Sequence, residues 1–348
     1  MSRLLVVADT MVGGLGAVAR DHARWFGEHG WQVTLAAPAP SGAADGPPQP
    51  GGAAGVVDLP VPGSARQIRL MLRAAGRLRH AAADVCADIV HVHGMRSAAI
   101  ATVAGIRRPF VSVHGVTAMA SDPPMYHAVR RSGRAVVARL AAEASSAEPG
   151  YGTGWRYLAF ASALLPGLDG LPFPPAGSIP TFAWLGALDA RKQPDVFIRA
   201  LAELAGTGRR VRGIVAGDGP RAAEMAELVR TTNAPVELVG HASPRRVLAE
   251  AWAVALFSRG EGTPLAVEEA MWAGRPVVAS RLPGIEYLMG TTGWLAGDAN
   301  HAAAAFAELC DHDVARAAGA ASGRRIRAVI APDDPWPALE QAYRRRLR

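Results

Sequence analysis

The chain has 348 residues, half of them hydrophobic, and carries a formal net charge of +7. This length is sufficient for two α/β domains of ordinary size. The sequence contains no run of 18 apolar residues, so no membrane-spanning helix is indicated. The sequence also lacks a basic patch interleaved with aromatic residues, so we expect no nucleic-acid partner. The two cysteines, Cys86 and Cys310, lack metal-ligand spacing, which favours a reduced, cytoplasmic setting.

The first half of the chain begins with a pattern typical of a doubly wound parallel sheet. A strand at residues 4–8 precedes a glycine-rich turn at 13–16, a helix at 17–30 and a strand at 32–37. The later elements expected are a strand at 55–59, a helix from 64 to about 83, and strands at 88–94 and 109–115. The glycine-rich turn presents amides to a phosphate, although Gly-x-Gly-x-x-Gly is not satisfied. The alternative is a tight turn that binds no ligand.

The second half of the chain alternates strands and helices more regularly. Strands are expected at residues 181–185, 211–216, 236–239, 254–258 and 276–279. The proline-rich stretch at 168–178 is the expected interdomain linker, and a final helix at 338–347 is expected to cross back onto the first domain. We therefore predict domains at 1–170 and 171–330 and a terminal segment at 331–348.

Two glutamates, Glu261 and Glu269, are separated by seven residues that begin with a Gly-Thr-Pro turn. Thr263 followed by Pro264 predicts a helix N-cap and first helical residue, so Glu261 lies before the helix and Glu269 more than a turn inside it. The free amides of that helix N-terminus suit a diphosphate between the two carboxylates. A nucleotide-sugar has hydroxyl groups on both sides of its diphosphate. The alternative is an ordinary amphipathic helix with exposed glutamates.

The sequence from 258 to 279 resembles the retaining GT-B glycosyltransferases of the glycosyltransferase 4 type. Their pattern of Ser-x-x-Glu-Gly, a turn, Glu-Ala-Met and Gly-x-Pro-Val-Val-Ala is present in full. The resemblance implies an α/β fold of two Rossmann-like doubly wound domains that face each other across a cleft. It assigns Glu269 to the ribose hydroxyls of the donor and Glu261 to the transferred sugar. It assigns the diphosphate to the turn between them, which contains Gly262, Thr263, Pro264 and Leu265.

The single lysine of the chain, Lys192, lies at the end of a second family motif. In the family, Gly-Arg-Leu-x-x-x-Lys supplies two cations to the diphosphate. The glycine, leucine and lysine are retained here, but the arginine is Ala187. One cation is therefore lost unless Arg191, Arg259 or another arginine replaces it. The alternative for Lys192 is chance retention in a surface loop.

The resemblance also assigns weaker sites. It places His114 against the transferred sugar and implies donor contacts by Gly14, Gly16, Gly217, Gly240 and His241. His114 ends a parallel strand, where open α/β sheets bind ligands. His91 and His93 alternate on one strand, and the alternative for them is burial with hydrogen bonding alone. We expect no bound metal, because the histidines lack carboxylate or cysteine partners in ligand spacing.

The function implied is retaining transfer of a hexose-type sugar from a nucleoside-diphosphate sugar to a hydroxyl group. A UDP-sugar is the favoured donor, and no cofactor is expected besides this co-substrate. The acceptor is a small molecule or a lipid, in natural-product or cell-envelope glycoside biosynthesis, and the irregular segment at 121–155 is expected to shape its pocket. The alternatives are a GT-B nucleotide-sugar epimerase and a nucleotide-sugar-binding protein without transferase activity.

Four arginines, at positions 66, 69, 73 and 77, follow helical spacing along one side of a predicted helix. Related enzymes that glycosylate lipids touch anionic membranes with such a helix. A solvated, charged helix face is the commoner explanation and is favoured here over weak membrane-surface contact.

Overall fold

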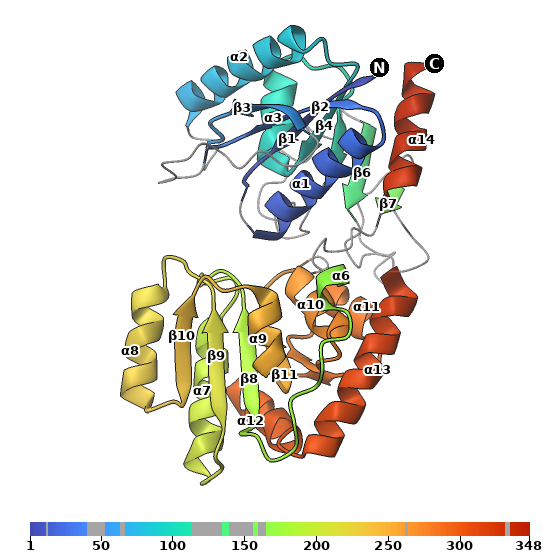
Figure 1. The fold of residues 1–348 in the computed structure, drawn as a ribbon. Helices are drawn as coiled ribbons and strands as arrows, with labels where there is room; N and C mark the ends of the chain where they lie inside the picture. The colour runs from blue at the N-terminus through green and yellow to red at the C-terminus, as the bar shows by residue number, and fades with distance from the viewer. Residues whose placement is uncertain are drawn as a thin grey trace. The chain divides into compact units, whose positions relative to one another are not determined.

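A computed structural model describes residues 1–11, 13–39, 53–62, 67–112, 134–138, 156–158, 165–261, 264–330 and 335–348. The chain divides into two compact units (Figure 1). Unit 1 comprises Met1–Leu140, Ala147–Ala163 and Asp333–Arg348, and unit 2 comprises Ala141–Ser146 and Leu164–Pro332. The C-terminal residues thus belong to the unit that contains the N-terminus.

Unit 1 is built on a parallel sheet in the order β3-β2-β1-β4-β5-β6-β7. Its strands are β1 (Arg3–Ala8), β2 (Gln32–Ala37), β3 (Ala53–Asp58), β4 (Ile89–His93), β5 (Phe110–Ser112), β6 (Arg134–Ala138) and β7 (Arg156–Leu158). Residues 4–8 of β1 are all buried, as expected for a strand covered on both faces.

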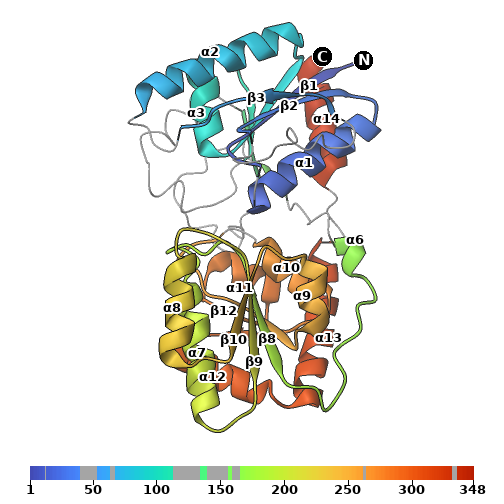
Figure 2. The ribbon, with the colours of Figure 1, turned by 60° about the vertical axis from the view of Figure 1, so that its left-hand side comes forward.

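The described residues of unit 1 form the helices α1 (Gly13–Glu28), α2 (Ile68–Asp84), α3 (Met95–Val103) and α14 (Pro335–Leu347). α1 packs beside α14, and α2 packs beside α3 (Figures 1 and 2). α14 contributes Leu339 and Tyr343, both almost completely buried, to a core that includes Phe26 and Trp31. The last helix of the chain therefore completes the core of the first unit.

Unit 2 contains a second parallel sheet in the order β10-β9-β8-β11-β12-β13. Its strands are β8 (Thr181–Leu185), β9 (Arg212–Ala216), β10 (Val236–Gly240), β11 (Ala253–Leu256), β12 (Val277–Ala279) and β13 (Trp294–Leu295). In chain order this is the 3-2-1-4-5-6 arrangement of a Rossmann sheet, with a switch point between β8 and β11. The predicted pair of doubly wound α/β domains is confirmed by the two sheets.

The helices of unit 2 are α6 (Leu165–Leu168), α7 (Pro194–Gly206), α8 (Ala222–Thr232), α9 (Pro244–Glu250), α10 (Leu265–Trp272), α11 (Pro283–Met289), α12 (Ala299–Glu308) and α13 (His312–Ile330). α7 packs with α8 and α12, whereas α10, α11 and α13 pack together. The core that α7 and α12 share contains four fully buried aromatic residues, Phe182, Trp184, Phe197 and Phe306.

Arg275 fastens the proline-rich segment expected as a linker onto unit 2. Its buried guanidinium donates hydrogen bonds to the carbonyl groups of Pro172, Leu248 and Ala273, at 2.6, 2.9 and 2.7 Å. Burial lowers the pKa of Arg275 to about 10. The three carbonyl groups come from separate segments, so a single side chain joins them.

Several expected boundaries differ from the structure. The glycines at 13–16 form the first turn of α1 instead of a turn before it, and α1 ends at Glu28. α2 begins at Ile68 instead of residue 64, and α14 begins three residues earlier than predicted. The strand expected at 109–115 is β5, at Phe110–Ser112, and residues 113–115 lie outside the described part of the chain.

Within the described residues, no helix has both the length and the apolar character required to cross a bilayer.

Candidate functional site

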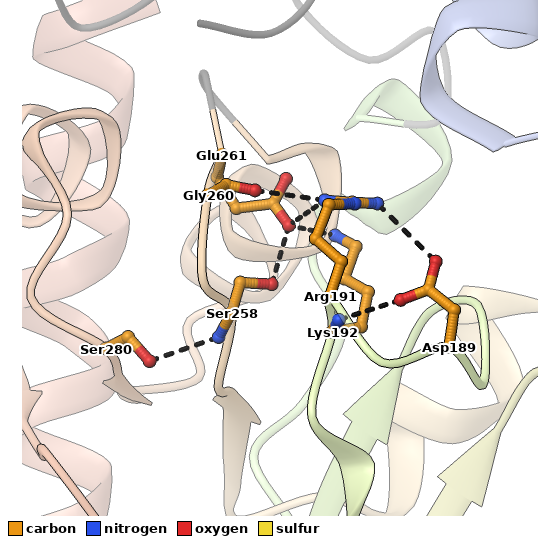
Figure 3. Close-up of polar contacts among 7 residues, drawn as sticks. All are labelled: Asp189, Arg191, Lys192, Ser258, Gly260, Glu261 and Ser280. Carbon is orange, nitrogen blue, oxygen red and sulfur yellow. Dashed lines mark hydrogen bonds and ion pairs between the residues drawn. The ribbon is translucent and has the colours of Figure 1, made fainter. Parts of the chain in front are cut away.

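The candidate site lies at the switch point of the sheet of unit 2, in the loops that follow the neighbouring strands β8 and β11. The loop after β8 carries Asp189, Arg191 and Lys192, and the loop after β11 carries Ser258 and Glu261. Figure 3 shows these five side chains gathered on one another. Open α/β sheets bind ligands at this position.

Glu261 is the centre of the cluster. Its Oε1 accepts hydrogen bonds from Ser258 Oγ at 2.6 Å and from the guanidinium of Arg191 at 2.6 Å, and it lies 2.7 Å from Lys192 Nζ (Figure 3). The Glu261 side chain is only 9% exposed. A single carboxylate oxygen of Glu261 therefore contacts two cations in the loops at the switch point.

Lys192 is the more enclosed of the two cations. Its side chain is 13% exposed, compared with 44% for Arg191. Burial lowers the pKa of Lys192, and the Glu261 carboxylate raises it in partial compensation. Asp189 accepts a hydrogen bond from the backbone amide of Lys192 at 2.7 Å and lies 3.9 Å from Arg191. Two carboxylates thus balance two cations in the cluster.

The two loops that carry the cluster are joined through their backbones as well. The amide of Arg259 donates to the carbonyl oxygen of Arg191 at 2.9 Å, and the Arg191 guanidinium donates to the carbonyl oxygen of Gly260 at 3.0 Å. The side chain of Arg259 is exposed and takes no part in these bonds. Of Arg191 and Arg259, the two named candidates to replace the family arginine that is Ala187 here, the fold therefore brings Arg191 to the cluster.

The glycines of the neighbouring loops permit close backbone approach. Gly217 has a φ of +148°, and a Cβ atom there would collide with the carbonyl oxygen of Gly186. Its amide donates to the carbonyl oxygen of Gly240 at 2.8 Å. The loops after β8, β9 and β10 are packed on each other in this way, and His241 is exposed beside them. Loop packing is thus sufficient to explain glycine at position 217.

The second glutamate of the motif lies on α10. This helix begins at Leu265 and has Pro264 as its N-cap, so the predicted cap at Thr263 and first helical residue at Pro264 are wrong by one position. Gly262 and Thr263 lie outside the described residues. Glu269 is only 6% exposed, as its neighbour Glu268 is at 2%. The alternative of an amphipathic helix with exposed glutamates is therefore wrong.

The remaining predicted site residues lie in unit 1. Gly14 is exposed in the first turn of α1, whereas Gly16 is buried and a Cβ atom there would collide with the backbone of Met11. His114 lies outside the described residues. His91 and His93 are completely buried and hydrogen-bonded, as the alternative for them predicted.

Two members of the cluster had no role in the sequence prediction. Ser258 belonged to the matched Ser-x-x-Glu pattern. Its spacing of three residues from Glu261 is the feature from which the hydrogen bond between its hydroxyl and the carboxylate could have been predicted. Asp189 had no such signal, because its contact with the amide of Lys192 depends on the turn that the loop adopts. In unit 1, His22 and Tyr343 join the buried histidines from distant parts of the sequence.

Comparison with known proteins gives matches for both units. Residues 13–147 match the family described as "Glycosyl transferase 4-like domain", and residues 179–312 match "Glycosyl transferases group 1". An alpha-D-kanosaminyltransferase of Streptomyces kanamyceticus is 31% identical over 121 residues, which cover 33% of this chain and 31% of that protein. The match thus spans about a third of the curated relative's length.

Solved structures match over nearly the whole chain. Sucrose-phosphate synthase from Thermosynechococcus elongatus has a TM-score of 0.77 at 18% identity, with 99% of each chain covered. A mutant form of TarM of S. aureus has a TM-score of 0.76 at 11% identity, with 100% of each chain covered. At such identities the likeness is one of fold. Together with the two domain matches and the two Rossmann-like sheets, it shows that the chain belongs to the GT-B glycosyltransferases of the glycosyltransferase 4 type.

Proposed function

We propose that this protein transfers a hexose-type sugar from a nucleoside-diphosphate sugar to an acceptor hydroxyl, with retention of configuration. The observation that carries the proposal is the cluster of Lys192, Arg191 and Glu261 at the switch point of unit 2. Two cations shared by a nearly buried carboxylate form a site that a diphosphate can occupy by competing for both. Glu269 on the following helix is the proposed partner of the ribose hydroxyls.

Donor binding would exchange the partners of Glu261. When diphosphate oxygens bind Lys192 and Arg191, the carboxylate loses its two cations and becomes an acceptor for hydroxyl groups of the sugar. The hydrogen bond from Ser258 Oγ still holds it in place. One residue therefore neutralises the cations before binding and orients the sugar afterwards.

The same cations would stabilise the leaving group during transfer. Negative charge develops on the diphosphate as the bond to the sugar breaks, and preorganised cations in an enclosed site stabilise it strongly. We propose that an oxygen of the departing diphosphate takes the proton of the acceptor hydroxyl on the same face of the sugar. The protein then supplies positioning and electrostatic stabilisation without a covalent intermediate.

Arg191 is the proposed replacement for the family arginine. Ala187 is exposed and offers no charge, whereas Arg191 reaches the carboxylate that also binds Lys192. Guanidinium groups bind phosphate oxygens in a bidentate manner. The second cation therefore comes from four residues further along the same loop.

A UDP-sugar and a small-molecule acceptor are the favoured substrates. The TarM structure was determined in complex with UDP, and the curated relative is named a kanosaminyltransferase. Incubation with UDP-, GDP- and dTDP-sugars, with and without an extract of candidate acceptors, tests the reaction. A transferase releases nucleoside diphosphate and forms a glycoside when acceptor is present. Conversion of the sugar without an acceptor would instead show an epimerase.

Binding at the proposed site has an independent test, because Lys192 is the only lysine. Amine-reactive labelling of the chain reports on Lys192 and on the terminal amino group of Met1, which serves as an internal control. We expect UDP to protect Lys192 but not Met1. Equal labelling of Lys192 with and without saturating UDP would remove it from the donor site.

A second surface supports a lipid acceptor. Ile68 and Leu72 on α2 are 64% and 60% exposed, and Arg69 and Arg73, which follow them directly in the sequence, are exposed as well. Arg77 instead pairs with Asp58 at 2.8 Å, and Arg66 lies outside the described residues. The sequence alone favoured a solvated face, but the exposure of Ile68 and Leu72 leads us to propose weak contact of this face with anionic membranes. Replacement of Ile68 and Leu72 by serine should abolish sedimentation with anionic vesicles, and unchanged sedimentation would contradict the contact.

A further inference from the structure

A group of three histidines is buried in unit 1, away from the cluster described above. His22 lies on α1, and His91 and His93 lie on β4 with their side chains on the same face of the sheet. All three are completely buried. Each can direct one ring nitrogen so that the three nitrogens lie within 4.8 Å of one another. No other such group of potential metal ligands occurs in the described part of the chain.

We propose that His22, His91 and His93 bind one Zn²⁺ ion, which fastens α1 to β4. Zn²⁺ binds imidazole nitrogens at about 2.0–2.1 Å with tetrahedral geometry, so two ligand nitrogens lie about 3.4 Å apart. His22 Nδ1 and His93 Nε2 are 2.8 Å apart, and one ring nitrogen from each of the three histidines lies within 4.8 Å of the other two. Formation of a three-histidine site therefore requires the pair at 2.8 Å to separate by about half an ångström and more distant nitrogens to approach by up to about 1.4 Å.

The surroundings provide the outer contacts that metal-binding histidines require. Such histidines normally hold a polar partner on the ring nitrogen that does not bind the ion. If His22 binds through Nδ1, its Nε2 lies 3.1 Å from the hydroxyl of Tyr343. His91 has Ser112 Oγ 2.6 Å from Nε2 and the Tyr343 hydroxyl beside Nδ1, so either nitrogen that binds the ion leaves the other on a hydroxyl group.

The ligand set determines the class of ion. Three imidazoles without a carboxylate or thiolate suit Zn²⁺ and its late first-row neighbours and exclude Mg²⁺ and Ca²⁺, which require oxygen ligands. Complete burial leaves no access for a substrate, so the ion would be structural. Tyr343 lies on α14, and binding of the ion would therefore also order the terminal helix through that hydroxyl.

The untagged full-length protein, stripped with a chelator and dialysed, provides the test. We expect it to bind one equivalent of Zn²⁺ by calorimetry and elemental analysis, to melt at a higher temperature with the ion, and to give visible ligand-field absorption with Co²⁺. His22→Gln should abolish binding. Tyr343→Phe keeps the aromatic ring but removes an outer contact, and should weaken binding by roughly 10–100-fold.

His80→Gln is the matched control, because His80 is exposed on α2 of the same unit and bonds to a carbonyl group of its own helix. It should bind Zn²⁺ as the unaltered chain does. Absence of stoichiometric Zn²⁺ and Co²⁺ binding would overturn the proposal and leave the histidines linked by hydrogen bonds alone. Unchanged binding by Tyr343→Phe or by folded His22→Gln would overturn it equally. If His22→Gln does not fold, Tyr343→Phe decides the matter.

Discussion

Replacement of Arg191 by alanine tests whether this residue supplies the second diphosphate cation. A hydrogen bond to a charged group contributes about 1.5–3 kcal/mol. The Arg191 side chain is 44% exposed, so screening by solvent favours the lower end. A loss of about 1.5 kcal/mol corresponds to roughly tenfold weaker binding of the nucleoside diphosphate. Calorimetry with UDP measures this directly, and kcat/KM for donor consumption should fall by at least as much.

Two further variants make this test specific. Arg259→Ala removes a neighbouring exposed arginine and should leave UDP affinity within about twofold, because surface charges away from the contact contribute little. Ala187→Arg, combined with Arg191→Ala, returns the cation to the family position and should restore affinity. Unchanged binding by Arg191→Ala, or a tenfold loss in Arg259→Ala instead, would refute the assignment.

The other predictions concern the same unit. Lys192→Ala should lower kcat roughly 10²–10³-fold, because an enclosed cation is lost from the leaving diphosphate, and it should melt nearly normally; wild-type turnover would exclude the role. Glu269→Ala should weaken UDP binding by about 1.5–3 kcal/mol, measured by calorimetry against its neighbour variant Glu268→Gln. The ¹³C-dimethylated Lys192 signal should titrate below the ordinary pKa of 10.5, and lower still in Glu261→Gln, which loses the carboxylate that raises it. Since the unfolded chain then binds more protons between the two pKa values, the contribution of Lys192 to the free energy of unfolding should rise with pH up to about 10.5. Arg275→Met should lower the free energy of unfolding by about 2–4 kcal/mol by leaving three carbonyl groups without a donor; denaturation with urea measures it, and a loss below about 0.5 kcal/mol would contradict the account.

The sequence predicted secondary structure and site residues best where they depend on local sequence patterns. The strands of unit 2 and the placement of Glu261 before a helix and Glu269 within it follow from apolar runs and turn residues. The motifs containing Glu261 and Lys192 also indicated that the two residues share one site, and the structure places them 2.7 Å apart. Spacing did not reveal that the carboxylate holds both cations, because that contact depends on how two loops meet.

Other features depend on contacts that local sequence does not encode. Glycine is a poor helix former, so the glycines at 13–16 predicted a turn. They begin α1 because Gly16 packs against the backbone of Met11, where no side chain fits. The histidine group was missed because His22 and His93 are 71 positions apart. Only the register of α1 over β4 brings them together.

The return of α14 to unit 1 sets the order in which a nascent chain can mature. The sheet and helices of unit 2 lie within residues 165–330 and can pack once these have left the ribosome. Unit 1 then still lacks Leu339 and Tyr343, and Tyr343 is the residue that covers Phe26, Phe110 and the buried histidines. The unit whose synthesis begins first is therefore the last to close. If synthesis stops before residue 335, the incomplete chain exposes this aromatic patch of unit 1. Chaperones and proteases could then recognise the chain as incompletely folded.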